Sequence, residues 1–157
     1  MTTSIVLQVL LAIGMANEKI SFVHNDLHTK NVIVEKTDLP RIEYHYNGKN
    51  YSIPTYGCIG RIFDFQFSTV VVNDDLIGCQ QGSMIASLKD WEIDPMNTDP
   101  IYDGYTLCRS VSLDRHKPLY SEYFGSLIDS HIERAPMSAL SGFTLSGVID
   151  ELIKSVG

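Results

Sequence analysis

The feature that most constrains the fold is an almost unbroken apolar run near the start of the chain, Ile5–Ala16, which only Gln8 interrupts with a strongly polar side chain. Apolar residues surround most of such a segment, so a helix built from it must be buried on most sides. The run is too short to span a bilayer, and no Lys or Arg precedes it as in a secretory signal peptide. We therefore expect a core-facing helix from Ser4 to about Asn17. Its cap is expected at Thr2, Thr3 or Ser4.

The composition indicates one globular domain over residues 1–157. Hydrophobic residues make up 44% of the chain and charged residues 20%, which is typical of a folded protein. The net charge of −7 argues against the basic footprint of nucleic-acid binders, so we expect neither a nucleic-acid nor a membrane partner. Cys58, Cys79 and Cys108 form no C-x-x-C pair and no disulfide framework, which favours a reducing, intracellular location.

A β-hairpin is predicted over Arg41–Ile53. Ile and Tyr side chains alternate along it, and Asn47-Gly48 in its middle supplies the two positive-φ positions of a type I′ turn. The β-branched run Val32–Val34 is expected to form a buried strand. Ile59–Phe63 is expected to form another strand, which ends directly before Asp64.

Helices dominate the prediction for the second half of the chain. Loops are expected at Gly78–Ser83 and Asp94–Pro100, which are rich in Gly, Pro, Asp and Asn. The spacing of apolar residues predicts helices over Met84–Trp91, Tyr102–Val111, Leu119–Ile132 and Leu145–Val156. The order of one helix, short strands and then further helices favours an α+β fold over a doubly wound sheet.

Two acids and an amide stand where phosphoryl-transfer chemistry needs them. Asp26 can accept a proton from an attacking hydroxyl, and Asn31 follows five residues on, so one tight loop can present both side chains. Asp64 comes from a different strand end. Because Mg²⁺ prefers hard oxygen ligands, we expect Asn31 and Asp64 to hold Mg²⁺ against the phosphates of ATP.

The run His24-Asn25-Asp26-Leu27-His28-Thr29-Lys30-Asn31 resembles the H-x-D-L-x-x-x-N catalytic loop of the protein-kinase-like superfamily. Asp64-Phe65-Gln66 resembles its metal-binding D-F-G, with Gln in place of Gly. The resemblance implies that Asp26 is the catalytic base and that Asn31 and Asp64 bind Mg²⁺ and ATP. It also implies that His24 supports the loop from inside and that Lys30 touches phosphate or substrate, with His28 as a weaker candidate.

A second match, Asp103–Cys108, resembles the D-x-W-S-x-G start of the long central helix in kinase C-terminal lobes. In that family the Asp braces the backbone of the catalytic loop. The resemblance implies this role for Asp103, with Tyr105 in the Trp position and Cys108 in the Gly position. The alternative is a surface Asp near a helix start, where it favours the helix dipole.

The resemblance covers Ser4 to about Leu113 and is closest to haspin-like serine/threonine kinases and divergent kinases of large DNA viruses. It implies a mostly helical C-terminal lobe with short strands, a β-hairpin insertion and no N-terminal lobe. The chain contains no G-x-G-x-x-G loop on a strand near its start, no V-A-I-K lysine and no A-P-E. In that family the lysine and the glycine-rich loop normally clamp the ATP phosphates, and they supply positioning and charge stabilisation.

Three functions remain open from the sequence. One is ATP-dependent phosphotransfer to a Ser or Thr hydroxyl of a protein substrate, with an N-lobe that is missing here or separate. Another is a non-catalytic, pseudokinase-like binding module. The third is a small-molecule kinase of the aminoglycoside or choline type. A zinc site at His24, Asp26 and His28 is a further alternative, because His at i and i+4 can share a helix face.

Overall fold

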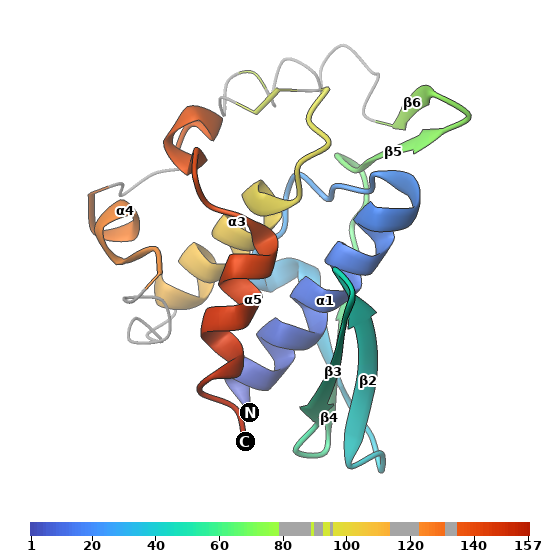
Figure 1. Cartoon of the computed structure of the whole chain (residues 1–157), viewed down its shortest axis with the longest axis vertical. Coiled ribbons are helices and arrows are strands. Elements are labelled where there is room, and N and C mark those ends of the chain that lie inside the picture. Colours follow the sequence, from blue (N-terminus) through green and yellow to red (C-terminus); the bar gives the residue numbers. More distant parts are fainter. Residues whose placement is uncertain (79–88, 90–92, 95, 114–122, 131–134) are drawn as a thin grey trace.

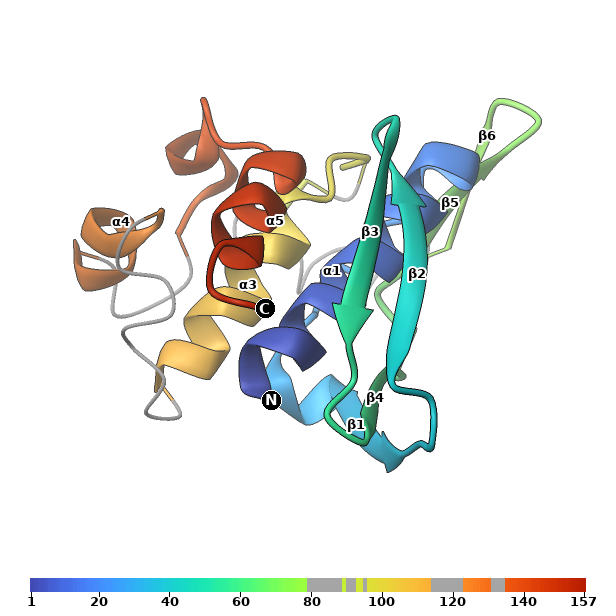
Figure 2. The same cartoon turned by 60° about the horizontal axis from the view of Figure 1, so that its bottom comes forward.

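The computed structural model describes residues 1–78, 89, 93–94, 96–113, 123–130 and 135–157. These residues form four α-helices and three two-stranded antiparallel sheets, so the secondary structure is of the α+β kind. Helix α1 (Thr2–Ile20) lies between two layers (Figures 1 and 2). One layer holds α3 (Ile101–Val111) and α5 (Leu145–Ile153), and the other is the hairpin of β2 (Arg41–Tyr46) and β3 (Lys49–Pro54).

Helix α1 is the core helix that the apolar run predicts, and it is longer than the expected Ser4–Asn17. Its side chains at Leu7, Leu10 and Leu11 are fully buried. By length and composition alone its 19 residues could cross a membrane, so the argument from the shorter apolar run does not apply to the whole helix. Half of its most apolar stretch is buried within the fold, as in the core helix of a globular domain.

The expected capping of α1 by Thr2, Thr3 or Ser4 is wrong. Met1 is the N-cap residue, and it makes no side-chain capping hydrogen bond. The buried Ser4 hydroxyl donates instead to the carbonyl oxygen of Pro54 at the end of β3. Ser4 therefore joins α1 to the hairpin, because a buried hydroxyl takes whichever acceptor lies in reach.

Gln8, the polar interruption of the apolar run, ties α1 to strand β4 (Cys58–Ile62). Its side-chain amide donates to the carbonyl of Cys58 at 3.2 Å and accepts from the N–H of Gly60 at 3.0 Å. The side chain is 1% exposed, so these two bonds supply the partners that a buried amide needs.

The β2–β3 hairpin forms as predicted, with Asn47 (φ 50°) and Gly48 (φ 71°) in its turn. Tyr46 packs against α1 so closely that a Cβ on Gly14 would lie 2.7 Å from its ring. On β3, the buried Tyr51 donates to Asp150 of α5 at 3.3 Å. These two tyrosines cover the hairpin's inner face.

Strand β1 (Val32–Lys36) pairs with β4 in register from Val32↔Ile62 to Lys36↔Cys58. The expected burial of this strand is wrong, because Ile33 is 46% exposed and Val34 is 54% exposed. The β-branched residues do form a strand, but its sheet has only two strands, and no layer of the described residues covers these two side chains. Strand β4 ends one residue before the expected Phe63.

A third hairpin is not among the predicted elements. Strand β5 (Thr69–Val72) pairs with β6 (Asp75–Gly78), and both turn residues, Asn73 and Asp74, have positive φ. Gly78 thus ends a strand where a loop over 78–83 is expected, and residues 79–83 lie outside the described part of the chain. The run of Val before Asn73-Asp74 is the signal that could have revealed this hairpin.

The later helices agree with the prediction where they are described. Helix α3 begins one residue before the expected Tyr102, and α5 ends at Ile153 instead of Val156. Helix α4 (Gly125–Ser130) lies inside the predicted range 119–132. A 3₁₀ turn, η4, spans Met137–Leu140. Residues 94 and 96–100 form no helix or strand, as expected. Apart from Lys89, the predicted helix over 84–91 falls outside the described residues.

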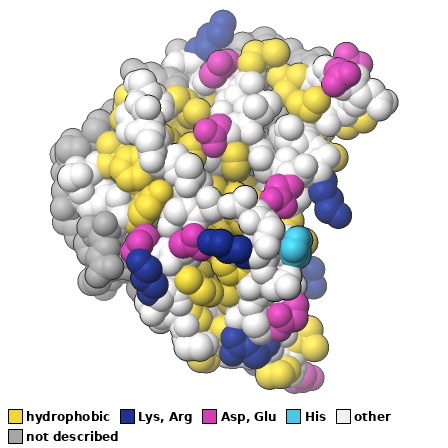
Figure 3. Space-filling view, viewed as in Figure 1, with side chains coloured by type: hydrophobic (Ala, Val, Ile, Leu, Met, Phe, Trp, Pro, Cys, Tyr) yellow, Lys and Arg dark blue, Asp and Glu magenta, His cyan; other side chains and the backbone are white. Residues whose placement is uncertain are grey.

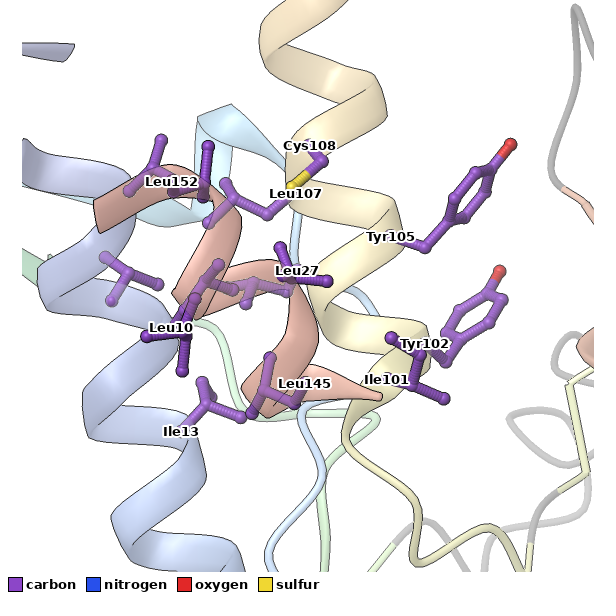
Figure 4. Packing of buried hydrophobic residues seen from close by; sticks show 14 of the residues in the cluster. Leu10, Ile13, Leu27, Ile101, Tyr102, Tyr105, Leu107, Cys108, Leu145 and Leu152 are labelled. Atoms are coloured by element: carbon purple, nitrogen blue, oxygen red, sulfur yellow. The ribbon is translucent and has the colours of Figure 1, made fainter. Parts of the chain in front are cut away.

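The core lies between α1, α3 and α5 (Figure 4). Leu10 points into it from α1, Leu107 from α3 and Leu145 from α5. Leu27, from the loop between α1 and β1, is fully buried among them. This loop is therefore anchored in the core at the residue that follows Asp26.

Candidate active site

The segment from His24 to Asn31 is a mostly buried loop that ends in a 3₁₀ turn, η1 (Thr29–Asn31). The Asn31 side chain folds back so that its Nδ2 donates to the backbone oxygen of Asp26 at 2.9 Å. The same nitrogen lies 3.4 Å from Oδ2 of the Asp26 carboxylate. The structure thus brings these two predicted site residues together.

The backbone next to Asn31 brings in the predicted metal ligand of the other strand. The N–H of Phe63 donates to the backbone oxygen of Asn31 at 3.1 Å, and the exposed Asp64 follows directly. Asp64 has φ 60°, a conformation that Asp tolerates better than most residues. The Asn31 side chain also carries an oxygen, Oδ1. This oxygen and the Asp64 carboxylate are hard donors of the kind that suits Mg²⁺.

His24 is fully buried beneath the loop, and both of its ring nitrogens have partners. Nε2 lies 2.9 Å from the carbonyl oxygen of Phe63, so it carries the proton and donates. Nδ1 accepts from the N–H of Asp26 at 3.3 Å, which requires the neutral ring. Burial is the main cause that lowers the pKa of His24, against the opposing effect of the Phe63 bond. His24 thus links the Asp26 backbone to the residue before Asp64.

Asp103, on α3, lies fully buried under the same loop. Its Oδ2 accepts from the N–H of His24 at 2.7 Å, and its Oδ1 accepts from the N–H of Asn25 at 2.9 Å. Burial raises the pKa of this carboxyl to about 7, although the two N–H donors act in the opposite direction. Asp103 is therefore not a surface residue, and it holds the loop backbone from below.

Two neighbours of Asp103 on α3 correspond to the other positions of the second motif. Tyr105 is 1% exposed and packs edge-on against Phe124, with ring centroids 5.5 Å apart. Cys108 is fully buried. Both side chains belong to the core that supports the loop.

The two remaining candidates of the loop differ in position. Lys30 is exposed. His28 is closer to the acid, because its Nε2 lies 3.4 Å from Oδ2 of Asp26 and 3.4 Å from Nδ2 of Asn31. His28 therefore borders the carboxylate more directly than the sequence suggests.

Two anchors of the loop have no signal in the sequence. The N–H of Thr29 donates to Oγ of Ser110 on α3 at 2.9 Å, and the two hydroxyls lie 2.9 Å apart. Asn25 donates from its side chain to the carbonyl of Phe67 at 3.0 Å. Both contacts join residues that are more than 40 positions apart, which local patterns do not reveal.

The ring of Phe65, which follows Asp64, packs at steep angles against two neighbouring rings while it remains 54% exposed. Its ring centroid lies 5.7 Å from that of His24 and 6.1 Å from that of Phe22. The replacement of Gly by Gln66 leaves an exposed side chain at the next position.

The zinc alternative is not supported. Residues 24–28 are not helical, so His24 and His28 do not share a helix face. Both ring nitrogens of His24 are engaged by the backbone. Among the described residues, no group of three or more His, Cys, Asp or Glu side chains could hold a metal ion.

Comparison with known proteins supports a kinase-like relationship. Over 76 residues, 48% of this chain, it is 34% identical to the serine/threonine-protein kinase haspin of Mus musculus. Over 80 residues, also 48% of the chain, it is 39% identical to the uncharacterized protein 098R of Invertebrate iridescent virus 6. Over 103 residues, 66% of the chain, it is 28% identical to the haspin homolog of Drosophila melanogaster.

These relatives are much longer than this chain. The matches cover 10% of the mouse protein, 13% of the viral protein and 17% of the fly protein. No protein-family model matches the chain. The shared part is thus kinase-like, and it corresponds to a fraction of each relative.

Proposed function

We propose that the chain is the catalytic C-terminal lobe of a serine/threonine protein kinase, which transfers the γ-phosphoryl group of ATP to a protein hydroxyl. The observation that carries the proposal is the junction of Asp26, Asn31 and Asp64. Asn31 contacts Asp26 through its side chain and the residue before Asp64 through its backbone. The partial likeness to haspin kinases supports the same reaction class.

Each of the three residues has one role in this proposal. The hydroxyl oxygen of the substrate bonds to the γ-phosphorus, while the bond from that phosphorus to the β–γ bridging oxygen breaks and ADP leaves with the electron pair. The hydroxyl proton passes to the Asp26 carboxylate. Asn31 and Asp64 would hold Mg²⁺, which neutralises charge on the phosphates when it is bound.

The surface around the junction supports completion by an N-terminal lobe. Phe63 and Phe65 flank Asp64 and are 39% and 54% exposed, and Ile33 and Val34 follow Asn31 along β1 with exposures of 46% and 54%. Large apolar side chains that are exposed on the segments next to a polar site are typical of a surface that another layer covers. A separate or preceding lobe would also bring the missing groups that clamp ATP.

A pocket of about 190 Å³ adjoins this surface, between the start of α1, β1 and α3. Its lining is almost entirely apolar and includes Ile5 and Val9 of α1, Val34 of β1 and Val111 of α3. The pocket extends the apolar surface that the proposed lobe would cover.

On the face drawn in Figure 3, acidic and basic side chains are interspersed and apolar ones lie between them.

The test is a transfer assay with radiolabelled ATP. The chain, alone and combined with an N-terminal kinase lobe such as that of mouse haspin, is incubated with Mg²⁺ and with a set of protein acceptors. Parallel reactions offer aminoglycosides and choline. Label on protein Ser or Thr supports the proposal.

The other outcomes separate the alternatives. Label on the small molecules and on no protein would support an aminoglycoside- or choline-type kinase. ATP binding by the folded combination without transfer to any acceptor would support a pseudokinase-like binding module. The Asp26→Asn variant, tested beside each reaction, reports contaminating kinases.

A further inference from the structure

Asn25, the residue before Asp26, is fully buried and joins the loop to the segment that follows Asp64. Its side-chain Nδ2 donates to the carbonyl of Phe67 at 3.0 Å, and its backbone N–H donates to Asp103 at 2.9 Å. Nothing in the motif assigns a role to this variable position.

The backbone at Asn25 limits which residues can stand there. Its φ is 66°, in the left-handed region, where Asn and Gly are among the few residues that fit without strain. Gly would satisfy the backbone alone. Asn also buries an amide whose Oδ1 has no hydrogen-bond partner within the described residues, which is unfavourable. The amide is thus held in place by its one donated bond, to Phe67.

Contacts from residues 23–25 reach the chain on both sides of Asp64. Before it, the ring of His24 donates to the carbonyl of Phe63 at 2.9 Å. After it come the bond from Asn25 to Phe67 and the paired backbone bonds between Val23 and Thr69, at 2.9 and 3.0 Å. Asp64 therefore lies within the segment 63–69, here called the arch, and both ends of this arch are hydrogen-bonded to residues 23–25. These residues come directly before Asp26.

We propose that Asn25 is a positioning residue that sets Asp64 relative to Asp26 and Asn31. It does so by fixing the C-terminal end of this arch through its bond to Phe67. The effect of Asn25 on nucleotide binding rests on the proposed function. The effect of Asn25 on the order of residues 64–69 does not rest on it, because this order follows from the hydrogen bond to Phe67 alone.

The variant that tests this is Asn25→Gly, which keeps the left-handed backbone and removes only the amide. Asn73→Gly is the matched control, since Asn73 has φ 51°, is exposed and lies in the β5–β6 turn. Asn25→Asp is a third variant, in which the shape is kept but a carboxylate faces the Phe67 carbonyl and cannot donate.

The first readout is backbone hydrogen exchange. In Asn25→Gly, the amides of Ser68 and Thr69 should exchange about tenfold faster, because one hydrogen bond that holds their segment is lost. Amides in α1 and α3 should keep their wild-type rates, and Asn73→Gly should leave all of these rates unchanged. Unchanged protection of Ser68 and Thr69 in Asn25→Gly, or an equal loss in α1 and α3, would overturn the proposal.

The second readout is the affinity for ATP with and without Mg²⁺, measured on fully folded samples. Asn25→Gly should weaken the Mg²⁺-dependent affinity about tenfold and leave the Mg²⁺-independent affinity unchanged, and Asn25→Asp should weaken it further. A general loss of stability would not produce this split. If the wild-type chain binds no Mg²⁺–ATP either alone or combined with an N-terminal kinase lobe, the proposed function fails, and the exchange rates alone decide whether Asn25 fixes the arch.

Discussion

Oδ2 of Asp103 accepts a hydrogen bond of 2.7 Å from the backbone N–H of His24, which lies 79 positions earlier in the chain. The other oxygen of the same carboxylate serves the next N–H, that of Asn25. One buried side chain on α3 thus satisfies two consecutive backbone donors directly before Asp26. The position of Asp26, the proposed catalytic base, therefore depends on a helix of the core.

Replacing Asp103 with Ala should lower the free energy of unfolding by about 1–3 kcal/mol, because two buried N–H groups lose their acceptor. Urea unfolding followed by circular dichroism would measure the loss. Asp38→Ala, at an exposed position, is the control and should change stability by less than about 0.5 kcal/mol. Equal stabilities for the two variants would show that Asp103 does not brace the loop.

His24 should make the free energy of unfolding decrease as the pH becomes acidic. Its pKa is lowered by burial, so below pH 6.5 the unfolded chain takes up a proton that the folded chain does not, and the free energy of unfolding decreases as the pH falls. Urea unfolding of the wild type and of His24→Gln at pH 7.5, 6.5 and 5.5 should show that the stability of the wild type relative to the variant decreases as the pH falls.

Asp103 changes the stability with pH in the opposite direction to His24. For this reason the experiment compares the wild type with a His24 variant. With its pKa raised to about 7, the folded chain binds a proton that the unfolded chain has lost, so this contribution falls as the pH rises from about 4 to 7. It is present in both proteins and cancels in the difference. Parallel pH profiles for wild type and His24→Gln would contradict the assignment of a neutral, buried His24.

Asp26→Asn should abolish transfer while it leaves nucleotide binding intact. Removing a general base costs about 10²–10⁴-fold in rate, and the amide keeps the size of the carboxylate. The measurement is kcat for the lobe combined with its N-terminal partner, next to the dissociation constant for Mg²⁺–ATP. Transfer by the variant at the wild-type rate would mean that Asp26 is not the base.

Gly14→Ala tests the close packing of the hairpin on α1. In an exposed helix this change stabilises by about 1 kcal/mol. Here the new Cβ would lie 2.7 Å from the ring of Tyr46, and overpacking of this kind costs about 1–3 kcal/mol. We expect a net loss of stability in thermal unfolding. A higher melting temperature for Gly14→Ala would show that Tyr46 can move away without cost.

Much of the fold could be predicted where a local pattern specifies it. The apolar run gives α1, and Asn47-Gly48 gives the turn of the β2–β3 hairpin. The exposure of Ile33 and Val34 could not be predicted, because a β-branched run indicates a strand but not what covers it. The sequence does not predict the β5–β6 hairpin, because an Asn-Asp turn is a weaker hairpin signal than Asn-Gly.

The candidate site also combines local features, which the sequence predicts, with contacts between distant residues, which it does not predict. The spacing of Asp26 and Asn31 within one loop is local, and the contact between them follows from it. The contacts of Asn25 with Phe67 and of Thr29 with Ser110 join distant parts of the chain, and they arise only when α3 and the arch around Asp64 pack against the loop. The expected intracellular location stays a prediction.

The most direct test of the account is a calorimetric titration of the chain with ATP, with and without Mg²⁺, beside Asp64→Asn. The control is Asp74→Asn, because Asp74 is also an exposed Asp with positive φ, at 65° against 60° for Asp64. We predict Mg²⁺-dependent binding that Asp64→Asn weakens at least about tenfold, since a charged ligand of the cation is lost, and that Asp74→Asn leaves unchanged. Absence of Mg²⁺–ATP binding by the folded chain, both alone and combined with an N-terminal kinase lobe, or equal affinity in wild type and Asp64→Asn, would contradict the proposed site.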